Sequence, residues 1–301
     1  MFDGNKDLLG IKTLTSAQIG KILDTAADMK RIINSDNKKR DMLSGKSIVN
    51  MFYENSTRTR LSFELAAKYL GAASANITAS GSSVKKGESL IDTAKTIDMM
   101  GTDIIIIRHA SSGSVDLVAK NVNASVINAG DGMNEHPTQA LLDMYTIKEK
   151  KGKFTGLKVA IAGDILHSRV ARSNIYGLTK MGADVHIGAP KTLLPPGIEG
   201  LGVKVFDNVE EAIVDADVVI ALRIQLERQK SGFFPSTKEY ARFFGIDENR
   251  LKLAKEDVLL MHPGPVNRGV ELSSAVMDGG QSEINEQVKN GVAVRMAVLS
   301  L

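Results

Sequence analysis

Arginine, histidine and hydroxyl side chains gather where short apolar runs of this sequence end. The run at residues 47–53 is followed by Ser56, Thr57, Arg58 and Thr59, which lead into a helical pattern. Backbone N–H groups at a helix start bind anions, and an anion there would offset the unfavourable effect of the macrodipole on Arg58. The segment therefore predicts a site for a small phosphate compound. A solvated helix start with an ordinary Ser/Thr cap is the alternative.

Two other runs in the first half end in polar groups. The run at residues 103–107 ends in Arg108, and a later run leads to His136 and Gln139 at a predicted helix start. A helix start favours the neutral imidazole, which donates a hydrogen bond to a carbonyl oxygen. A histidine before a proline is often only a cap, but the position of His136 among several strand ends favours a functional interpretation.

The connection at residues 79–88 contains Ser82 and Lys86 among small and basic residues. Such a segment is suited to closing over a bound anion. A surface loop with solvated lysines has the same composition, so the segment on its own does not define a site.

The second half supplies groups suited to carboxylates and carbonyls. Arg169 follows one apolar run, and Arg223 and Gln225, which alternation places on one side of the chain, follow another. Arginine binds carboxylates in a bidentate manner, although an arginine at a helix start is also a common surface ion-pair partner. The last run is followed by His262 and a turn with prolines, which leave carbonyl groups without competing N–H donors. For His262 the alternative is a buried residue at a strand end.

Missing residues and motifs exclude several classes of function. The 301 residues include no cysteine, which excludes disulfides, thiolate metal sites and a cysteine nucleophile, and the net charge of only +3 argues weakly for nucleic acid. A Walker loop is absent, and Asp164 and Leu166 stand where a dinucleotide-binding loop needs glycines. No catalytic triad, carboxylate pair or metal cluster is evident. A reaction that needs only positioning and charge stabilisation fits best.

The location of the protein also follows from what is missing. No apolar run approaches the roughly 18 residues that span a bilayer. The N-terminal segment MFDGNKDLLG lacks the pattern of a signal peptide. We therefore expect a cytoplasmic protein.

Alternating strands and helices must position these groups. Apolar runs predict strands at residues 47–53, 73–77, 103–107, 124–128, 158–163, 184–188, 203–206, 217–222 and 258–261. Helical periodicity predicts a first helix capped by Thr15 or Ser16, and further helices near 57–70, 88–100, 115–120, 137–150 and 283–299. In the last helix we expect one buried face with Val288, Val292, Met296 and Leu299.

This order of elements predicts an α/β fold with two parallel-sheet, three-layer domains, terminal helices and an active site in the cleft between the domains. Residues 150–156 interrupt the alternation. We therefore expect one domain at residues 1–150, joined by the C-terminal helix at 283–301, and a second at 151–282.

At these residues the chain resembles the catalytic chains of aspartate carbamoyltransferases, within the aspartate/ornithine carbamoyltransferase superfamily. The matching segments, in the family's order, are Ser56-Thr-Arg-Thr-Arg60, Lys85-Lys-Gly-Glu88, His136-Pro-Thr-Gln139, Gly163-Asp-Ile-Leu-His-Ser-Arg169, Arg223-Ile-Gln-Leu-Glu-Arg228 and His262-Pro-Gly-Pro265. The two segments with arginines in the second half are the more specific to aspartate. The ornithine branch is the closest competitor, but it typically carries a cysteine in the last turn.

The resemblance implies transfer of the carbamoyl group of carbamoyl phosphate to L-aspartate, in de novo pyrimidine (UMP) biosynthesis, without a cofactor or metal. The implied carbamoyl phosphate ligands are Ser56, Thr57, Arg58, Thr59, Ser82, Lys86, Arg108, His136, Gln139, Gly264 and Pro265, the first domain being the carbamoyl-phosphate-binding domain. The implied aspartate ligands are Lys86, Arg169, Arg223 and Gln225, mostly in the second, aspartate-binding domain. The implied catalytic residues are Arg58, Thr59, Lys86, Arg108 and His136. Glu54 would orient arginines across the domain cleft.

The resemblance also implies a homotrimer in which Ser82 and Lys86 complete the site of a neighbouring chain. It leaves open a higher assembly with regulatory chains, and it implies no nucleic-acid or membrane partner. A binding module or nucleic-acid protein is the alternative of a different class, and a lack of turnover would support that alternative.

The shared site gives a first testable prediction. We expect Lys86→Ala and Arg58→Ala homotrimers each to be nearly inactive, because a charge-assisted contact to phosphate is worth about 1.5–3 kcal/mol. Mixed and reassembled, the two variants should regain activity at interfaces that combine an intact Arg58 with an intact Lys86. Verified mixed trimers with no more activity than either parent would refute the shared site.

Overall fold

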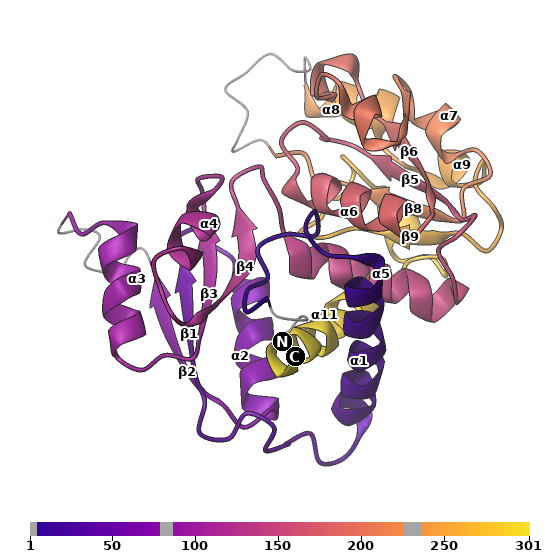
Figure 1. Ribbon diagram of the computed structural model, residues 1–301. Coiled ribbons are helices and arrows are strands. Elements are labelled where there is room, and N and C mark those ends of the chain that lie inside the picture. The colour runs from indigo at the N-terminus through magenta and orange to yellow at the C-terminus, as the bar shows by residue number, and fades with distance from the viewer. Residues whose placement is uncertain (1–4, 79–86, 226–235) are drawn as a thin grey trace. The chain divides into compact units, whose positions relative to one another are not determined.

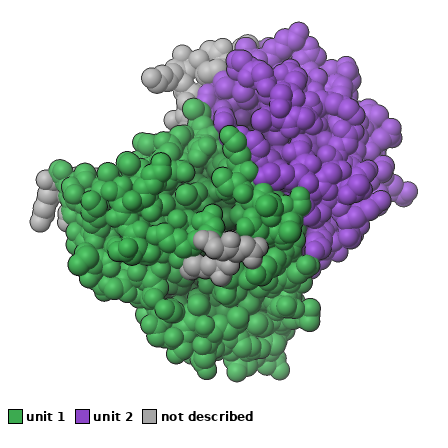
Figure 2. All heavy atoms as spheres, in the orientation of Figure 1, with its two compact units in different colours: residues 1–142, 289–301 green, residues 143–288 purple. Residues whose placement is uncertain are grey.

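The computed structural model describes every residue except 1–4, 79–86 and 226–235 (Figure 1). The chain forms two compact units, one of residues 1–142 with 289–301 and one of residues 143–288 (Figure 2). The chain passes from one unit to the other within α5 (Pro137–Lys151) and again within α11 (Ile284–Ser300). The units therefore divide inside a helix, whereas the predicted boundary lies at the end of that helix.

Unit 1 contains a four-stranded parallel sheet in the order β2-β1-β3-β4. Its strands are β1 (Ser47–Phe52), β2 (Ala73–Thr78), β3 (Ile104–His109) and β4 (Ser125–Asp131). Its helices are α1 (Ser16–Asn34), α2 (Thr57–Tyr69), α3 (Leu90–Met99) and α4 (Ser114–Ala119), with the N-terminal part of α5 and the C-terminal part of α11. The strands and helices predicted for this half are present, with slightly shifted ends.

Both faces of the unit 1 sheet are covered, as the continuous apolar run of β3 requires. Ile105 and Ile107 pack with residues of α3 and α4 in one apolar cluster. Ile104 and Ile106 point to the other face and are equally buried, and α2 contacts β1 and β2. The unit is therefore a layer of strands between two layers of helices.

Unit 2 contains a five-stranded parallel sheet in the order β7-β6-β5-β8-β9. Its strands are β5 (Lys158–Ala162), β6 (Asp184–Gly188), β7 (Lys204–Phe206), β8 (Val218–Ala221) and β9 (Leu259–Met261). Its helices are α6 (Arg169–Lys180), α7 (Val209–Ile213), α8 (Thr237–Phe244), α9 (Glu248–Leu251) and α10 (Ser274–Met277), with 3-10 turns η3 (Lys191–Leu193) and η4 (Ile198–Leu201). The predicted α/β fold with two parallel sheets is confirmed.

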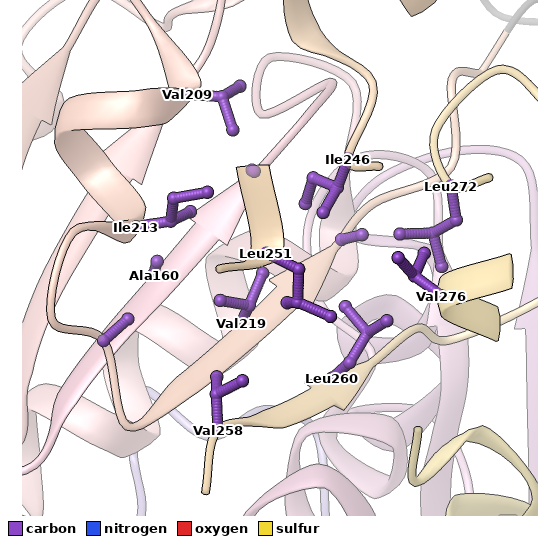
Figure 3. Close-up of a cluster of buried hydrophobic side chains, with 13 residues drawn as sticks. Ala160, Val209, Ile213, Val219, Ile246, Leu251, Val258, Leu260, Leu272 and Val276 are labelled. Carbon is purple, nitrogen blue, oxygen red and sulfur yellow. The ribbon is translucent and has the colours of Figure 1, made fainter. Parts of the chain in front are cut away.

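Alternation along the strands also builds the core of unit 2. Ala160, Val219 and Leu260, on three neighbouring strands, point to one face of the sheet (Figure 3). Residues of α7, α9 and α10 cover this face and close the apolar cluster around them. Burial of this face against the helices removes apolar surface from water and fixes the strands whose ends carry the polar loops.

The last helix, α11, buries Met296 and Leu299 as predicted, but not Val288. Val288 is 59% exposed, so its assignment to the buried face is wrong, whereas Gln287 and Arg295 are buried. The Arg295 guanidinium donates to the Ser62 hydroxyl at 3.0 Å and lies over the ring of Phe63. Because polar side chains make up part of the buried face, apolar periodicity alone identifies it only in part. Among the residues that the structure describes, no helix has the length and apolar composition of a membrane span.

One buried histidine in unit 2 makes stability depend on pH. His186 in β6 stacks on the ring of Phe206, and its Nε2 lies 3.0 Å from the Asp184 carboxylate. Burial lowers the pKa of His186 and outweighs the opposite effect of the contact with Asp184. His186 therefore binds a proton more weakly in the folded chain than in the unfolded chain, where a histidine titrates near pH 6.5.

We expect the free energy of unfolding to fall as the pH drops below the unfolded pKa of His186. His186→Phe removes the titrating group and keeps an aromatic ring against Phe206. Urea unfolding at about pH 7.5 and about pH 5.5, on either side of the unfolded value, should show a smaller loss of stability in the variant than in the wild type. Equal losses in the two proteins would contradict the assignment.

Candidate active site

The predicted phosphate-binding segment lies at the carboxyl end of β1. Ser56 is the N-cap residue of α2, Thr57 and Arg58 are exposed in the first turn, and Thr59 is buried. The Ser56 side chain makes no capping hydrogen bond, whereas the Ser and Thr N-caps of α1, α3, α6, α8 and α10 all do. The helix start and the Ser56 hydroxyl are therefore suited to an anion.

Arg108 lies at the end of the neighbouring strand β3. Its Nη2 is 2.6 Å from Glu54 Oε1, and its Nη1 donates to the Ala129 carbonyl at 3.3 Å. Because only 13% of the arginine side chain is exposed, this ion pair is well shielded from water. Glu54 thus holds an arginine of its own unit in place beside the end of β4.

His136 is buried directly before α5, and the loop that precedes it is held by Asp131. The buried Asp131 carboxylate accepts hydrogen bonds from Gly113 N at 2.8 Å, from the Asn128 amide at 2.8 Å and from Glu135 N at 3.2 Å. Several donors on one carboxylate leave the loop little conformational freedom. The hydrogen bonds of Asp131 therefore fix the backbone of the loop that carries His136.

The residue before His136 is fixed from the N-terminal segment. The buried Glu135 carboxylate accepts hydrogen bonds from the backbone N–H groups of Ile11 at 2.7 Å and Lys12 at 3.2 Å. A Cβ at Gly10 would overlap the Glu135 carboxylate, so a side chain at this position would displace that carboxylate. The following turn of α5 buries Gln139.

In unit 2, Arg169 begins α6 and is 3% exposed. The loop before it is shaped by Asp164, whose carboxylate accepts from His167 N at 3.1 Å and contacts His167 Nδ1 at 2.9 Å. Asp164, whose presence excludes a dinucleotide-binding loop, is therefore buried, and it fixes the loop that leads to Arg169.

Buried carboxylates also fix the segment after β8. The consecutive N–H groups of Ile224 and Gln225 donate to Glu271 at 2.9 Å and to Asp164 at 3.3 Å. Ile224 is buried, while Arg223 and Gln225 are partly exposed, as alternation predicts. Burial raises the pKa of Glu271.

Glu271 also holds the turn after β9. Its carboxylate accepts hydrogen bonds from Asn267 N at 2.8 Å and from the Asn267 amide at 2.7 Å. The same carboxylate thus ties this turn to the segment of Arg223 and Gln225. Asp131, Glu135 and Glu271 are not among the predicted site residues, because nothing in the sequence separates these carboxylates from exposed ones.

Each unit gathers its predicted residues at the carboxyl ends of neighbouring strands. In unit 1 these lie at the end of β3 or follow β1 and β4, and in unit 2 they follow β5, β8 and β9. Ser82 and Lys86 lie outside the described residues. Within the described ranges, no group of three or more histidines or carboxylates could hold a metal ion.

Two models of one protein family match the two halves of the chain. The model of the aspartate/ornithine carbamoyltransferase carbamoyl-P binding domain matches residues 6–149, and that of the Asp/Orn binding domain of the same family matches residues 155–301. The chain therefore belongs to the aspartate/ornithine carbamoyltransferase family, as the sequence resemblance predicted.

Individual relatives and solved structures from this family are similar to the chain over nearly its whole length. The chain is 69% identical to the aspartate carbamoyltransferase catalytic subunits of Ruminiclostridium cellulolyticum and Acetivibrio thermocellus, over 99% of this chain and 95% of each relative. It superposes on the Trypanosoma cruzi aspartate transcarbamoylase in complex with carbamoyl aspartate and phosphate (TM-score 0.90, 29% identity, 99% and 96% of the two chains). It also superposes on the Pyrococcus furiosus ornithine carbamoyltransferase (TM-score 0.87, 32% identity, 98% and 96%).

The position of His136 gives a prediction. If His136 donates to a developing oxyanion, His136→Ala should lower kcat by roughly 10²–10³, the range for one lost oxyanion donor. Folding, followed by circular dichroism, should change little, because Asp131 and Glu135 still hold the loop. A folded variant with unchanged kcat would assign His136 to a capping role.

Proposed function

We propose that this chain transfers the carbamoyl group of carbamoyl phosphate to the amino group of L-aspartate, giving N-carbamoyl-L-aspartate and phosphate. The observation that carries the proposal is the pair of relatives that are 69% identical over 99% of the chain, both aspartate carbamoyltransferase catalytic subunits. The fold alone does not indicate whether aspartate or ornithine is the acceptor, since this chain superposes on an aspartate enzyme and an ornithine enzyme with TM-scores of 0.90 and 0.87.

Unit 1 would bind carbamoyl phosphate. The start of α2, with Ser56, Thr57, Arg58 and Thr59, would hold the phosphate by helix N–H groups, hydroxyls and charge. Thr59, Arg108 and His136 would donate to the carbonyl oxygen, and Gln139 would orient the amino group. The Ser56 hydroxyl makes no capping hydrogen bond, which supports its assignment to the phosphate. The shielded ion pair with Glu54 supports a fixed Arg108 guanidinium.

Unit 2 would bind aspartate and complete the carbamoyl site. Arg169, Arg223 and Gln225 would bind the two carboxylates, and carbonyl groups of the Gly264–Pro265 turn would position the carbamoyl group. The neutral aspartate amine then attacks the carbonyl carbon, donors stabilise the oxyanion, and phosphate leaves with the amine proton. Catalysis in this scheme comes from positioning and charge stabilisation, without a metal or cofactor.

The assembly and cellular setting belong to the same proposal. Residues 1–150 with the last helix would form the carbamoyl phosphate domain, and residues 151–282 the aspartate domain, with the active site between them. A cytoplasmic homotrimer, in which Ser82 and Lys86 of one chain serve the next, would supply carbamoyl aspartate to pyrimidine synthesis. The family membership of both halves of the chain supports this arrangement.

The choice of acceptor tests the proposal. We expect carbamoylation of L-aspartate from carbamoyl phosphate without added metal or nucleotide, because three donor side chains match two carboxylates, whereas ornithine would need an anion for its side-chain ammonium. A product assay with each acceptor, with and without a chelator, measures this directly. Equal or better turnover of ornithine would contradict the proposal, and no turnover of either would favour a binding module.

A further inference from the structure

The turn after β9 is held by the side chain of the residue that begins it. His262 is 2% exposed, and its Nδ1 accepts a hydrogen bond from Gly264 N at 2.8 Å. Because Nδ1 accepts this bond, the ring proton of the neutral imidazole lies on Nε2. The contact fixes the peptide that enters the Gly264–Pro265 turn, where Gly264 has a φ of +62°.

The histidine backbone is fixed in turn by a line of buried amide and carboxylate side chains. His262 N donates to Gln287 Oε1 at 2.9 Å, and Gln287 Nε2 donates to Asp143 Oδ1 at 2.7 Å. The other oxygen of Asp143 accepts from the Asn174 amide at 2.8 Å. All of these side chains are at most 3% exposed, so the line from α6 through α5 and α11 to the end of β9 lies within the core of unit 2.

The Gln287 amide has one orientation that satisfies both of its neighbours. Gln287 must accept on one side and donate on the other, which neither a glutamate nor an apolar residue does. A buried donor or acceptor left without its partner costs the desolvation of that group. The line therefore sets where His262 Nδ1 lies, and Nδ1 sets where the turn lies.

The same device occurs at a strand end of unit 1. His109, the last residue of β3, accepts a hydrogen bond at Nδ1 from Ser111 N at 2.9 Å. In both places a histidine side chain accepts the N–H of the second residue after it, as the shorter side chain of asparagine does in an Asx turn. Each histidine thus shapes a loop at the carboxyl end of a parallel sheet.

We propose that His262 is a positioning residue: its backbone is held by Gln287 and, through Gln287, by Asp143, and its Nδ1 fixes the Gly264–Pro265 turn so that the carbonyl groups of the turn meet the carbamoyl group of the substrate. This inference rests on the proposed function, which assigns those carbonyl groups to carbamoyl phosphate. His262 itself touches no reacting atom in this role. Its buried position at a strand end is therefore compatible with an effect on catalysis.

The test compares two amides at position 262. Asparagine places an acceptor near Nδ1 and readily bonds the N–H two residues on, whereas glutamine places its polar atoms nearer Nε2. We expect His262→Asn to keep kcat/KM for carbamoyl phosphate close to wild type. His262→Gln and His262→Leu should lower it by roughly 10- to 100-fold, the scale for a misplaced binding group.

Inhibition by inorganic phosphate distinguishes a misplaced turn from a general loss of structure, because a general loss would weaken this inhibition as well. Phosphate carries no carbamoyl group, so its inhibition constant against carbamoyl phosphate should be the same in all three variants. Gln287→Leu should lower kcat/KM in the same direction without changing phosphate inhibition. His186→Asn, a matched change at a buried histidine of the same unit, should leave kcat/KM unchanged.

Wild-type turnover of aspartate is measured first, and its absence would overturn the proposed function and this inference with it. With an active wild type, equal kcat/KM for the Asn and Gln variants, whether both normal or both low, would overturn the inference alone. Loss of phosphate inhibition along with kcat/KM would also overturn it, because the effect would then be general. If the Leu variant does not fold, the comparison of Asn with Gln decides.

Discussion

Backbone N–H groups in the loops after the parallel strands need acceptors, and buried carboxylates supply them. Asp131, Asp164 and Glu271 each accept backbone hydrogen bonds from loop residues at a strand end, and Glu135 accepts them from the N-terminal segment. Burial penalises a carboxylate, and several converging donors offset that penalty. The loops are thereby restricted to one conformation, and the arginines and histidines that they carry are held in place before any ligand arrives.

Strand–helix alternation was enough to predict the two parallel sheets and the strand ends at which the polar residues lie, because burial on both faces leaves a clear apolar run, as in β3. The pattern could not predict which polar groups are buried. Val288 was expected inside and is exposed, while Gln287 is buried by its hydrogen bonds. Such burial depends on partners distant in sequence, among them Asp143, which periodicity does not reveal.

The fold alone does not distinguish the aspartate enzymes from the ornithine enzymes that this chain resembles. The sheets and their covering helices are shared with both aspartate and ornithine enzymes. What can differ between these branches is the set of side chains on the loops, such as Arg223 and Gln225 after β8. A rigid scaffold with variable loop chemistry allows one architecture to serve acceptors of opposite side-chain charge.

The division of unit 1 between residues 1–142 and 289–301 has a consequence for synthesis of the chain. Domains generally fold as units, the N-terminal one first as the chain emerges. Here the buried Arg295, which bonds to Ser62, is made only after all of residues 143–288. The unit whose synthesis begins first is thus completed last, and the ribosome must finish the intervening unit before the first sheet receives its final helix.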